Sequence, residues 1–503
     1  MCWLVALLGS GCVACGGSSQ GETGPIPRGL ERYYTQRLDW RACGPNECAF
    51  LSVPLDYRNP EGTTARLALL RRRATRPEQR IGSLVVNPGG PGGSGIGLAA
   101  YLADRLAPTV LGQRFDLVGF DPRGVGTSQP AVHCFGTGEN DAERLAVEVD
   151  NSPAGVVRQQ ERTRRYADAC RQRSGSMLLA NVGTRDVARD LDVLRSALGD
   201  RYLTYYGYSY GTQIAYTYAE RFPRNVRAMV LDGPVDPAMS RDEWAIARAA
   251  AFQNAFNTFA AWCAGRDCPL GTDPGQATTR YRNIVLALIG RPVGVSDGRK
   301  LSYTDSVTAT IAALYEPQKW EPLRRGLLQL ASGQPPDSLM QLADGFLGRA
   351  FDGYDNNRDV LTAVGCVDDD AARASDPATL RTLSARKLAA APFEDPGTGP
   401  DPAESACAMW PVPPTGHPHQ PQVVGAPTML VIAVTGDPAT PFQGGLDLAR
   451  DLRARLITVE GTQHTAGLRG VACVDRPIHA YLTELALPPD GARCSVPPDS
   501  LAH

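Results

Sequence analysis

Short apolar runs alternate with amphipathic stretches through the first half of the chain. Four runs are mostly apolar and are each followed by glycine, proline or polar residues: 81–86, 115–120, 202–206 and 226–231. A helix is predicted over 185–198, where apolar side chains recur at spacings of four, three and four: Val187, Leu191, Leu194 and Leu198. A second helix is predicted over 212–221. Strands that alternate with helices are typical of a parallel sheet covered on both faces.

This alternation stops between residues 241 and 421. The segment has a helical pattern with interspersed proline and glycine, and it predicts helices over 243–263, 278–289, 303–315 and 322–330. The alternation then resumes with a strand over 427–434, a helix over 444–452 and a strand over 456–459. We therefore expect a core in two parts, 29–240 and 422–503, with one mainly helical cap inserted at 241–421. A β-hairpin over 50–55 and 64–72 is expected near the start of the core.

The first 28 residues have the pattern of an export signal and a linker. A short apolar run ends in small residues, and 16–28 are rich in glycine, serine and proline. In a lipoprotein signal of this kind, Cys12 or Cys15 would carry the lipid, although no Lys or Arg precedes the apolar run. No later stretch is long and apolar enough to predict a transmembrane helix. We expect a secreted or cell-envelope protein whose only membrane attachment is an N-terminal lipid.

Charge and cysteine content bear on the binding partners and the cellular compartment of the protein. The 51 basic and 53 acidic side chains nearly balance, which gives no indication of nucleic-acid binding. Of 13 cysteines, ten remain after Cys2, Cys12 and Cys15, an even number that is typical of an exported disulfide-bonded protein. Buried free thiols are the alternative. Nearest-neighbour order favours five pairs: Cys43–Cys48, Cys134–Cys170, Cys263–Cys268, Cys366–Cys407 and Cys473–Cys494.

Gly207-Tyr-Ser209-Tyr-Gly211 lies between the predicted strand over 202–206 and the helix over 212–221. Two glycines around a serine in this context allow a strained turn that lifts the serine hydroxyl above the sheet. The helix N-terminus beneath it favours developing negative charge. The sequence therefore predicts an α/β-hydrolase fold with Ser209 as the nucleophile.

A serine nucleophile needs a base, and the base needs an acid to orient it. In this fold both partners follow the serine along the chain. Of the six histidines, His464 stands directly after the strand over 456–459, and we expect it to be the base. Asp437 follows the strand over 427–434 and is the expected acid. Asp232, after the strand over 226–231, is the rival.

The oxyanion of an acyl-transfer reaction needs two backbone N–H donors. We expect them at Tyr210, which follows the nucleophile, and at Gly90, in the glycine-rich turn after the strand over 81–86. That turn also spells G-x-G-x-x-G over 90–95, so a dinucleotide-binding fold with Asp121 as the ribose-binding acid is a second hypothesis. A binding protein on the same fold, without catalysis, is a third.

These residues resemble the secreted bacterial tripeptidyl aminopeptidases and their mycobacterial exported serine-protease relatives, within the wider prolyl iminopeptidase group. The likeness covers roughly residues 40–495 and is carried by motifs at 87–92 (Asn-Pro-Gly-Gly-Pro-Gly), 115–124, 206–211, 366–368 (Cys-Val-Asp), 410–413 (Trp-Pro-Val-Pro), 435–441 and 461–464. Membership implies an α/β-hydrolase core, a helical lid, and a triad of Ser209, Asp437 and His464. Prolyl iminopeptidases usually have His where Pro88 stands, which weakens a case for proline-specific cleavage.

The resemblance implies removal of short peptides from a free N-terminus, or ester cleavage in some members. A free α-amino group is cationic and would need a carboxylate under the cap. The candidates are Asp368 and Asp232, followed by Asp369, Asp370, Asp236 and Glu243. A carboxylesterase or lipase is the alternative. We expect a monomer that needs no metal or organic cofactor and that acts on a peptide or a small ester.

Overall fold

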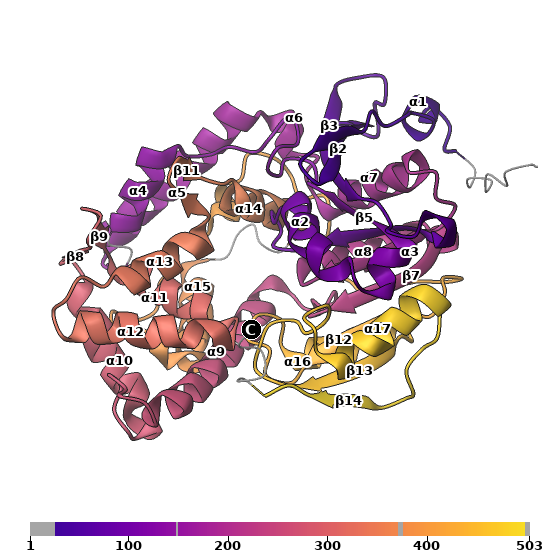
Figure 1. Cartoon of the computed structure of the whole chain (residues 1–503). Coiled ribbons are helices and arrows are strands. Elements are labelled where there is room, and N and C mark those ends of the chain that lie inside the picture. Colours follow the sequence, from indigo (N-terminus) through magenta and orange to yellow (C-terminus); the bar gives the residue numbers. More distant parts are fainter. Residues whose placement is uncertain (1–25, 147–148, 371–375, 498–503) are drawn as a thin grey trace, which may run out of the picture.

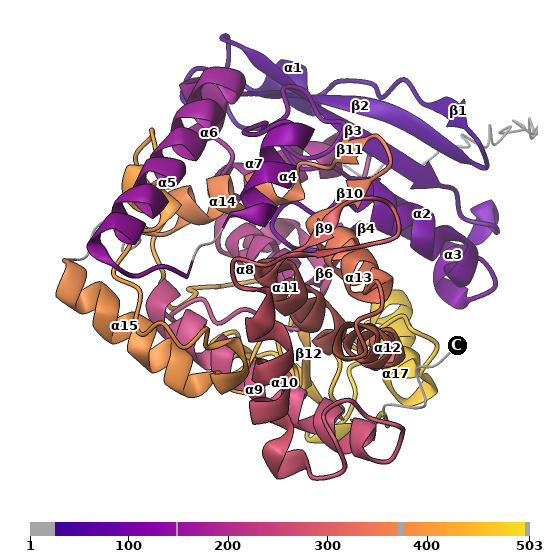
Figure 2. The ribbon, with the colours of Figure 1, turned by 90° about the vertical axis from the view of Figure 1, so that its left-hand side faces the viewer.

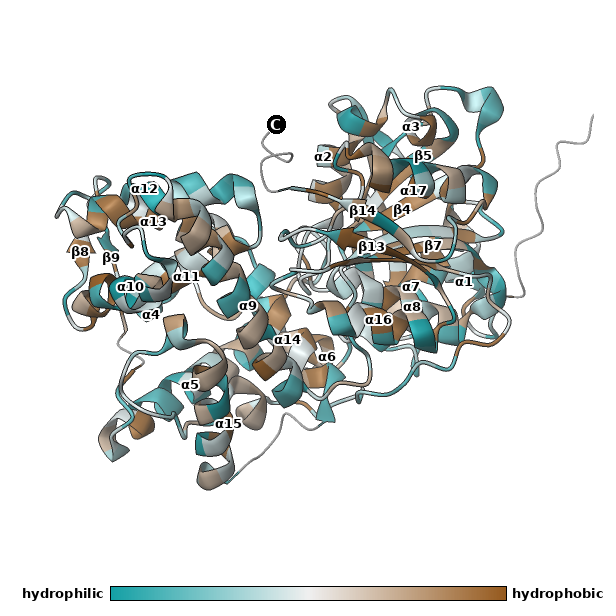
Figure 3. Cartoon of the chain, turned by 90° about the horizontal axis from the view of Figure 1, so that it is seen from below, coloured by the Kyte–Doolittle hydropathy of each residue, from teal (hydrophilic) through white to brown (hydrophobic). Residues whose placement is uncertain are grey.

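The computed structural model describes residues 26–497 except 147–148 and 371–375, and these residues form two lobes. One lobe is built on a large sheet and the other is mainly helical, as Figure 1 and Figure 3 show from two directions. Cys12, Cys15 and the rest of the predicted export signal up to residue 25 lie outside the described residues. Within the described part of the chain, no helix combines the length and apolar character needed to cross a bilayer.

The core lobe contains a ten-stranded sheet in the order β1-β2-β3-β5-β4-β6-β7-β12-β13-β14. From β5 to β14 the neighbours pair in parallel, whereas β1, β2 and β3 form an antiparallel edge. The strands are β1 Arg41–Cys43, β2 Asn46–Pro54, β3 Thr64–Arg72, β4 Gly82–Asn87, β5 Phe115–Phe120, β6 Leu203–Tyr208, β7 Val226–Asp232, β12 Leu430–Val434, β13 Arg455–Glu460 and β14 Ala492–Ser495. The expected α/β-hydrolase architecture is confirmed.

Helices cover both faces of this sheet, and successive strand residues contact opposite layers. Val85 packs on the layer of α1, α7, α8 and α16, whereas its neighbours Leu84 and Val86 pack on the layer of α2, α3 and α17. Burial on both faces explains why the central strands are mostly apolar (Figure 3). These helices are α1 Glu31–Tyr34, α2 Gly95–Leu106, α3 Val110–Arg114, α7 Thr184–Ala197, α8 Tyr210–Arg221, α16 Phe442–Asp451 and α17 Ala472–Glu484.

The cap lobe follows β7 and has its own hydrophobic core. Aromatic side chains dominate that core, and the rings of Phe256 and Phe393 stack with centroids 5.0 Å apart. Two small hairpins, β8 Val293–Gly294 with β9 Lys300–Leu301 and β10 Arg349–Ala350 with β11 Gly353–Tyr354, lie between its helices. The cap helices are α9 Arg241–Ala264, α10 Ala277–Val285, α11 Tyr303–Leu314, α12 Trp320–Ala331, α13 Asp337–Leu347, α14 Asn357–Asp368 and α15 Pro377–Ala390.

The cap has a second part that the sequence pattern assigned to the core. After β5, the chain forms α4 (Thr137–Leu145), α5 (Pro153–Ser174) and α6 (Ser176–Leu179). The helices α4 and α5 extend beside the cap helices (Figures 1 and 2), whereas Cys170 at the end of α5 and Leu178 of α6 pack in the hydrophobic core of the sheet. Asp359 of α14 accepts hydrogen bonds from the N–H of Cys134 (2.7 Å) and the hydroxyl of Tyr166 (2.8 Å). The insertion predicted at 241–421 therefore contacts helices that precede it in the chain.

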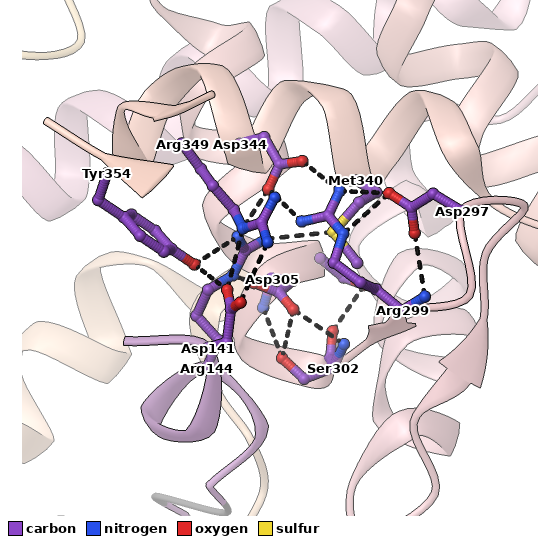
Figure 4. A network of polar contacts seen from close by, with 11 residues as sticks. Asp141, Arg144, Asp297, Arg299, Ser302, Asp305, Met340, Asp344, Arg349 and Tyr354 are labelled. Atoms are coloured by element: carbon purple, nitrogen blue, oxygen red, sulfur yellow. Dashed lines mark hydrogen bonds and ion pairs between the residues drawn. The ribbon is translucent and has the colours of Figure 1, made fainter. Parts of the chain in front are cut away.

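A polar network joins α4 to the rest of the cap (Figure 4). The buried guanidinium of Arg144 donates to Asp305 (2.7 Å) and Asp344 (2.6 Å). Arg299 also binds Asp344, and Arg349 binds Asp141 of α4. Because the opposed charges come from segments far apart in sequence, the two parts of the cap are held together as one unit.

Five disulfides connect the ten cysteines in the nearest-neighbour order favoured by the sequence. Cys366 of α14 and Cys407 are both buried, and their bond closes a loop with a sequence separation of 41. Cys43–Cys48 and Cys263–Cys268 each span a separation of only five. Disulfides of this number are typical of proteins that fold in an oxidising compartment.

Candidate active site

Ser209 occupies the turn between β6 and α8. Its backbone lies at φ 53° and ψ −123°, a strained conformation for a residue with a side chain. A Cβ on Gly207 would lie 2.4 Å from the carbonyl oxygen of Gly211. The turn is therefore too tight for a side chain at residue 207. The turn therefore has the geometry of a nucleophile elbow at the carboxyl edge of the sheet.

His464 and Asp437 meet at the same edge, after β13 and β12. Nδ1 of His464 lies 2.8 Å from Oδ2 and 2.9 Å from Oδ1 of Asp437. The aspartate side chain is fully buried, whereas 12% of the histidine side chain is exposed. Asp437 Oδ1 also accepts the N–H groups of Ala439 (2.8 Å) and Thr440 (2.9 Å). This fixed carboxylate engages Nδ1 and leaves Nε2 for a proton transfer.

The turn after β7 lies between the serine and the histidine. The N–H of Ser209 donates to the carbonyl of Asp232 over 2.8 Å. A Cβ on the next residue, Gly233, would lie 3.2 Å from Cε1 of His464. Ser209 and the imidazole are thus packed against consecutive residues of one turn.

The glycine-rich turn after β4 lies against the nucleophile. A Cβ on Gly89 would lie 2.8 Å from the nitrogen of Tyr210 and 3.0 Å from Cβ of Ser209. The N–H of Gly89 donates to Asn87 Oδ1 (2.9 Å), whereas that of Gly90 makes no hydrogen bond within the described part of the chain. Tyr210 is the first residue of α8, where helix N–H groups have no intrahelical partner. The amides of Gly90 and Tyr210 are both free to face a developing oxyanion.

The carboxylate of Asp437, and not that of Asp232, contacts the ring of His464. Asp232 is fully buried, and its carboxylate accepts the hydroxyl of Tyr206 (2.8 Å) and the N–H groups of Ala466 (3.1 Å) and Gly467 (2.8 Å). Burial raises its pKa. Asp232 therefore fastens the loop after His464 to the sheet, and its burial and hydrogen bonds do not favour the predicted role in substrate binding.

Asp368 lies at the end of α14 and is linked to the residue after the nucleophile. It accepts hydrogen bonds from the N–H (2.9 Å) and the hydroxyl of Thr184, whose oxygen lies 2.6 Å from the hydroxyl of Tyr210. Burial raises the pKa of Asp368 to about 6. The residue as a whole is partly exposed, although its carboxylate is buried against Thr184.

The other predicted carboxylates have different surroundings. Asp236 accepts the N–H of Ala238 (2.9 Å), and Glu243 accepts the hydroxyl of Ser240 (3.0 Å) at the start of α9. Asp369 is buried and Asp370 is exposed. Asp236 and Glu243 thus serve local turns and caps.

The dinucleotide hypothesis does not fit the structure. Asp121 is almost fully buried and accepts the hydroxyl of Ser94 over 2.6 Å. The helix α2 begins only at Gly95, so residues 90–94 form an open loop rather than the start of a helix. A Cβ on Gly92 would lie 2.5 Å from the carbonyl oxygen of Asn357, because α14 of the cap begins against this loop. Neither a ribose nor a pyrophosphate finds its usual partners here.

Sequence reasoning missed two residues at the base. Thr440 donates its hydroxyl to Asp437 Oδ2 (2.9 Å) and lies 3.4 Å from Nδ1 of His464. Tyr315 of the cap accepts the N–H of His464 (2.8 Å), and the two rings meet edge to face with centroids 5.3 Å apart. The motif over 435–441 contains Thr440 and could have indicated it, whereas nothing local relates residue 315 to residue 464.

The described residues include no group of three or more His, Cys, Asp or Glu side chains that could hold a metal ion. His417 and His419, an H-x-H pair, lie in an exposed connector. His419 faces Glu220 at 3.2 Å. A serine, a histidine and an aspartate gathered at the sheet edge are the residue types used in acyl transfer through a serine.

Comparison with known proteins agrees with this site. The family model of the alpha/beta hydrolase fold matches residues 82–470. The chain is 43% identical to serine protease Hip1 of Mycobacterium tuberculosis, over 97% of this chain and 96% of that protein. It is 49% identical to carboxylesterase B of the same species, over 89% and 86% of the two chains.

A third relative, the tripeptidyl aminopeptidase of Streptomyces lividans, is 32% identical over 88% of this chain and 82% of that protein. The chain is therefore a serine hydrolase that belongs to the α/β-hydrolase family.

Proposed function

We propose that this protein is an exported serine hydrolase that cleaves short peptides from a free N-terminus, with Ser209, His464 and Asp437 as its triad. The observation that carries the triad is the contact between Nδ1 of His464 and Asp437 at the sheet edge where the strained Ser209 turn lies. No other described histidine has a buried carboxylate on its ring nitrogen beside this turn. The five disulfides support export.

The proposed mechanism uses the Ser209 hydroxyl, Nε2 of His464 and two backbone amides. Oγ of Ser209 attacks the acyl carbon while Nε2 of His464 takes the serine proton. The carbonyl electron pair moves to its oxygen, which accepts hydrogen bonds from the amides of Gly90 and Tyr210. As the intermediate collapses, the bond to the amine or alcohol breaks, and His464 returns the proton to that leaving group. Water then attacks the acyl-enzyme by the same steps, releasing the acid and Ser209.

Amine recognition is assigned to Asp368. A free N-terminus is cationic below its pKa of about 8, and a carboxylate gives it a charge-assisted hydrogen bond. Asp368 lies on the cap side of the site and is connected through Thr184 to Tyr210, next to the nucleophile. Similarity to a serine protease and to a tripeptidyl aminopeptidase supports a peptide substrate.

A carboxylesterase is the second candidate, and one observation favours it. The ring of Tyr315 lies between His464 and Phe346, with centroids 5.3 Å and 5.7 Å away, and Phe346 is 41% exposed. This apolar surface beside the base could receive the alcohol part of an ester. The 49% identity to carboxylesterase B points the same way.

A comparison of matched substrates tests the proposal. A tripeptide p-nitroanilide with a free N-terminus should be cleaved with a kcat/KM about 10- to 100-fold above that of its N-acetylated twin, because a hydrogen bond to a charge contributes about 1.5–3 kcal/mol. Equal rates for the twins would contradict amine recognition, and a preference for p-nitrophenyl butyrate over both would favour the esterase. Ser209→Ala, the control, should lose roughly 10⁶-fold in kcat on every substrate.

A further inference from the structure

The backbone of His464 is held by the cap as well as by the core. Its N–H donates to the carbonyl of Tyr315, the residue that follows α11, over 2.8 Å. Tyr315 also packs its ring edge to face with the imidazole and contacts the ring of Phe252 at 5.5 Å. The cap thus contacts both the main chain and the ring of the expected base.

Arg469 connects the other side of the same residue to the cap. Its Nη2 donates to the carbonyl of His464 (3.2 Å) and to the hydroxyl of Thr465 (3.1 Å), and it pairs with Oε1 of Glu316 (3.3 Å). Glu316 directly follows Tyr315 in the cap. Two adjacent cap residues therefore engage His464, one through its N–H and the other through Arg469.

The loop that carries His464 needs such support. Thr465 lies at φ 64° and Leu468 at φ 60°, in the left-handed region that β-branched and bulky residues rarely adopt. Strained backbone of this kind persists only where surrounding contacts hold it. Thr465 receives one of these contacts from Arg469, whose charge is balanced by Glu316.

We infer that the Tyr315–Glu316 turn and Arg469 are positioning residues that couple the seating of the cap to the alignment of His464 with Ser209. Because a base displaced by about 1 Å can lose about 10²-fold in rate, a contact that fixes the His464 loop affects turnover without touching the substrate. This inference rests on the proposed function, since it gives His464 the role of base. It makes the cap part of the catalytic geometry as well as a cover.

The test compares two ion pairs of similar length and exposure. Arg469–Glu316 spans 3.3 Å with side chains 25% and 33% exposed, and Arg282–Asp395, within the cap, spans 3.2 Å with 28% and 29% exposed. Arg469→Met should lower kcat about 10- to 100-fold with KM nearly unchanged, and it should slow labelling by a fluorophosphonate to a similar extent. Glu316→Gln should have a smaller effect in the same direction. Arg282→Met should change neither kcat nor labelling.

Two further variants separate positioning from general stability. Arg469→Lys keeps a cation near Glu316 and should recover part of the lost kcat, and the double variant Glu316→Gln/Arg469→Met should be no slower than Arg469→Met alone. Thermal unfolding should show comparable losses of stability for the Arg469 and Arg282 variants. Wild-type labelling rates in both Arg469→Met and Glu316→Gln would overturn the inference. A wild-type protein that the probe does not label at Ser209 would instead refute the proposed function.

Discussion

The hydroxyl of Thr440 donates to Oδ2 of Asp437 over 2.9 Å and lies 3.4 Å from Nδ1 of His464. Thr440 therefore shares the carboxylate that orients the imidazole. Thr440→Val removes a hydrogen bond to a charged group, which contributes about 1.5–3 kcal/mol, so kcat should fall about 10- to 100-fold. Thr440→Ser, which keeps the hydroxyl, should retain most of the activity in the same steady-state assay. A Thr440→Val enzyme with wild-type kcat would show that Asp437 and His464 hold each other without help.

The two buried aspartates at the sheet edge, Asp437 and Asp232, should respond differently to substitution by asparagine. Asp437→Asn offers His464 a neutral partner and should lower kcat by roughly 10⁴-fold, as expected when the base takes the wrong tautomer. Asp232→Asn should act mainly on stability, since its amide group would face N–H donors of Ala466 and Gly467. A loss of about 1–3 kcal/mol in the free energy of unfolding is expected there. Urea unfolding and kcat, measured on both variants, distinguish the two roles, and the reverse pattern would exchange their assignments.

Asp368 should make the protein less stable as the pH rises through the mildly acidic range. Its pKa is about 6 in the folded protein, against 3.8 for an ordinary aspartate, so the folded state holds the proton more tightly. Asp368 therefore adds to the free energy of unfolding below about pH 4. That contribution, about 2–3 kcal/mol, is lost as the pH rises from about 4 to 6. Asp368→Asn should flatten this part of the pH profile in thermal unfolding. Asp104→Asn, whose side chain is 85% exposed, should leave it unchanged.

The packing of α4 against the cap helices α11 and α13 should depend on Arg144. Arg144→Met leaves Asp305 buried without its cation, and the loss of a buried partner destabilises by about 3–5 kcal/mol. Arg165→Met is the control, because Arg165 is 61% exposed and pairs with Glu143 inside the same segment. Its effect should stay within about 0.5 kcal/mol. Equal unfolding midpoints for the two variants in urea would mean that α4 is held by other contacts.

Local sequence was sufficient to predict most of the core and to propose its chemistry. The apolar runs over 81–86, 115–120 and 427–434 became buried strands, since apolar side chains on both faces suit only a strand covered from both sides. The order of Ser209, Asp437 and His464, each directly after a strand, placed them at one sheet edge, because parallel strands end together. Such inferences need only the spacing of apolar residues along the chain and the rule that parallel strands end at the same edge of a sheet.

Other features depended on contacts between distant segments. Asp232 and Asp437 both follow apolar strands, and only the packing of Tyr206 and Gly467 around Asp232 separates a buried structural carboxylate from the partner of His464. The sequence pattern places α4 in the core, whereas ion pairs such as those of Arg144 with Asp305 and Asp344 join this helix to the cap.

The sequence by itself determined the fold class and predicted the nucleophile and the order of its partners, because these follow from short-range periodicity and turn chemistry. The tertiary structure alone decided which acid faces the histidine and that Tyr315, Glu316 and Arg469 surround it. The physical reason is that a hydrogen bond or an ion pair requires atoms about 3 Å apart. Separations of some 150 residues, as between Tyr315 and His464, carry no local pattern that fixes such a distance.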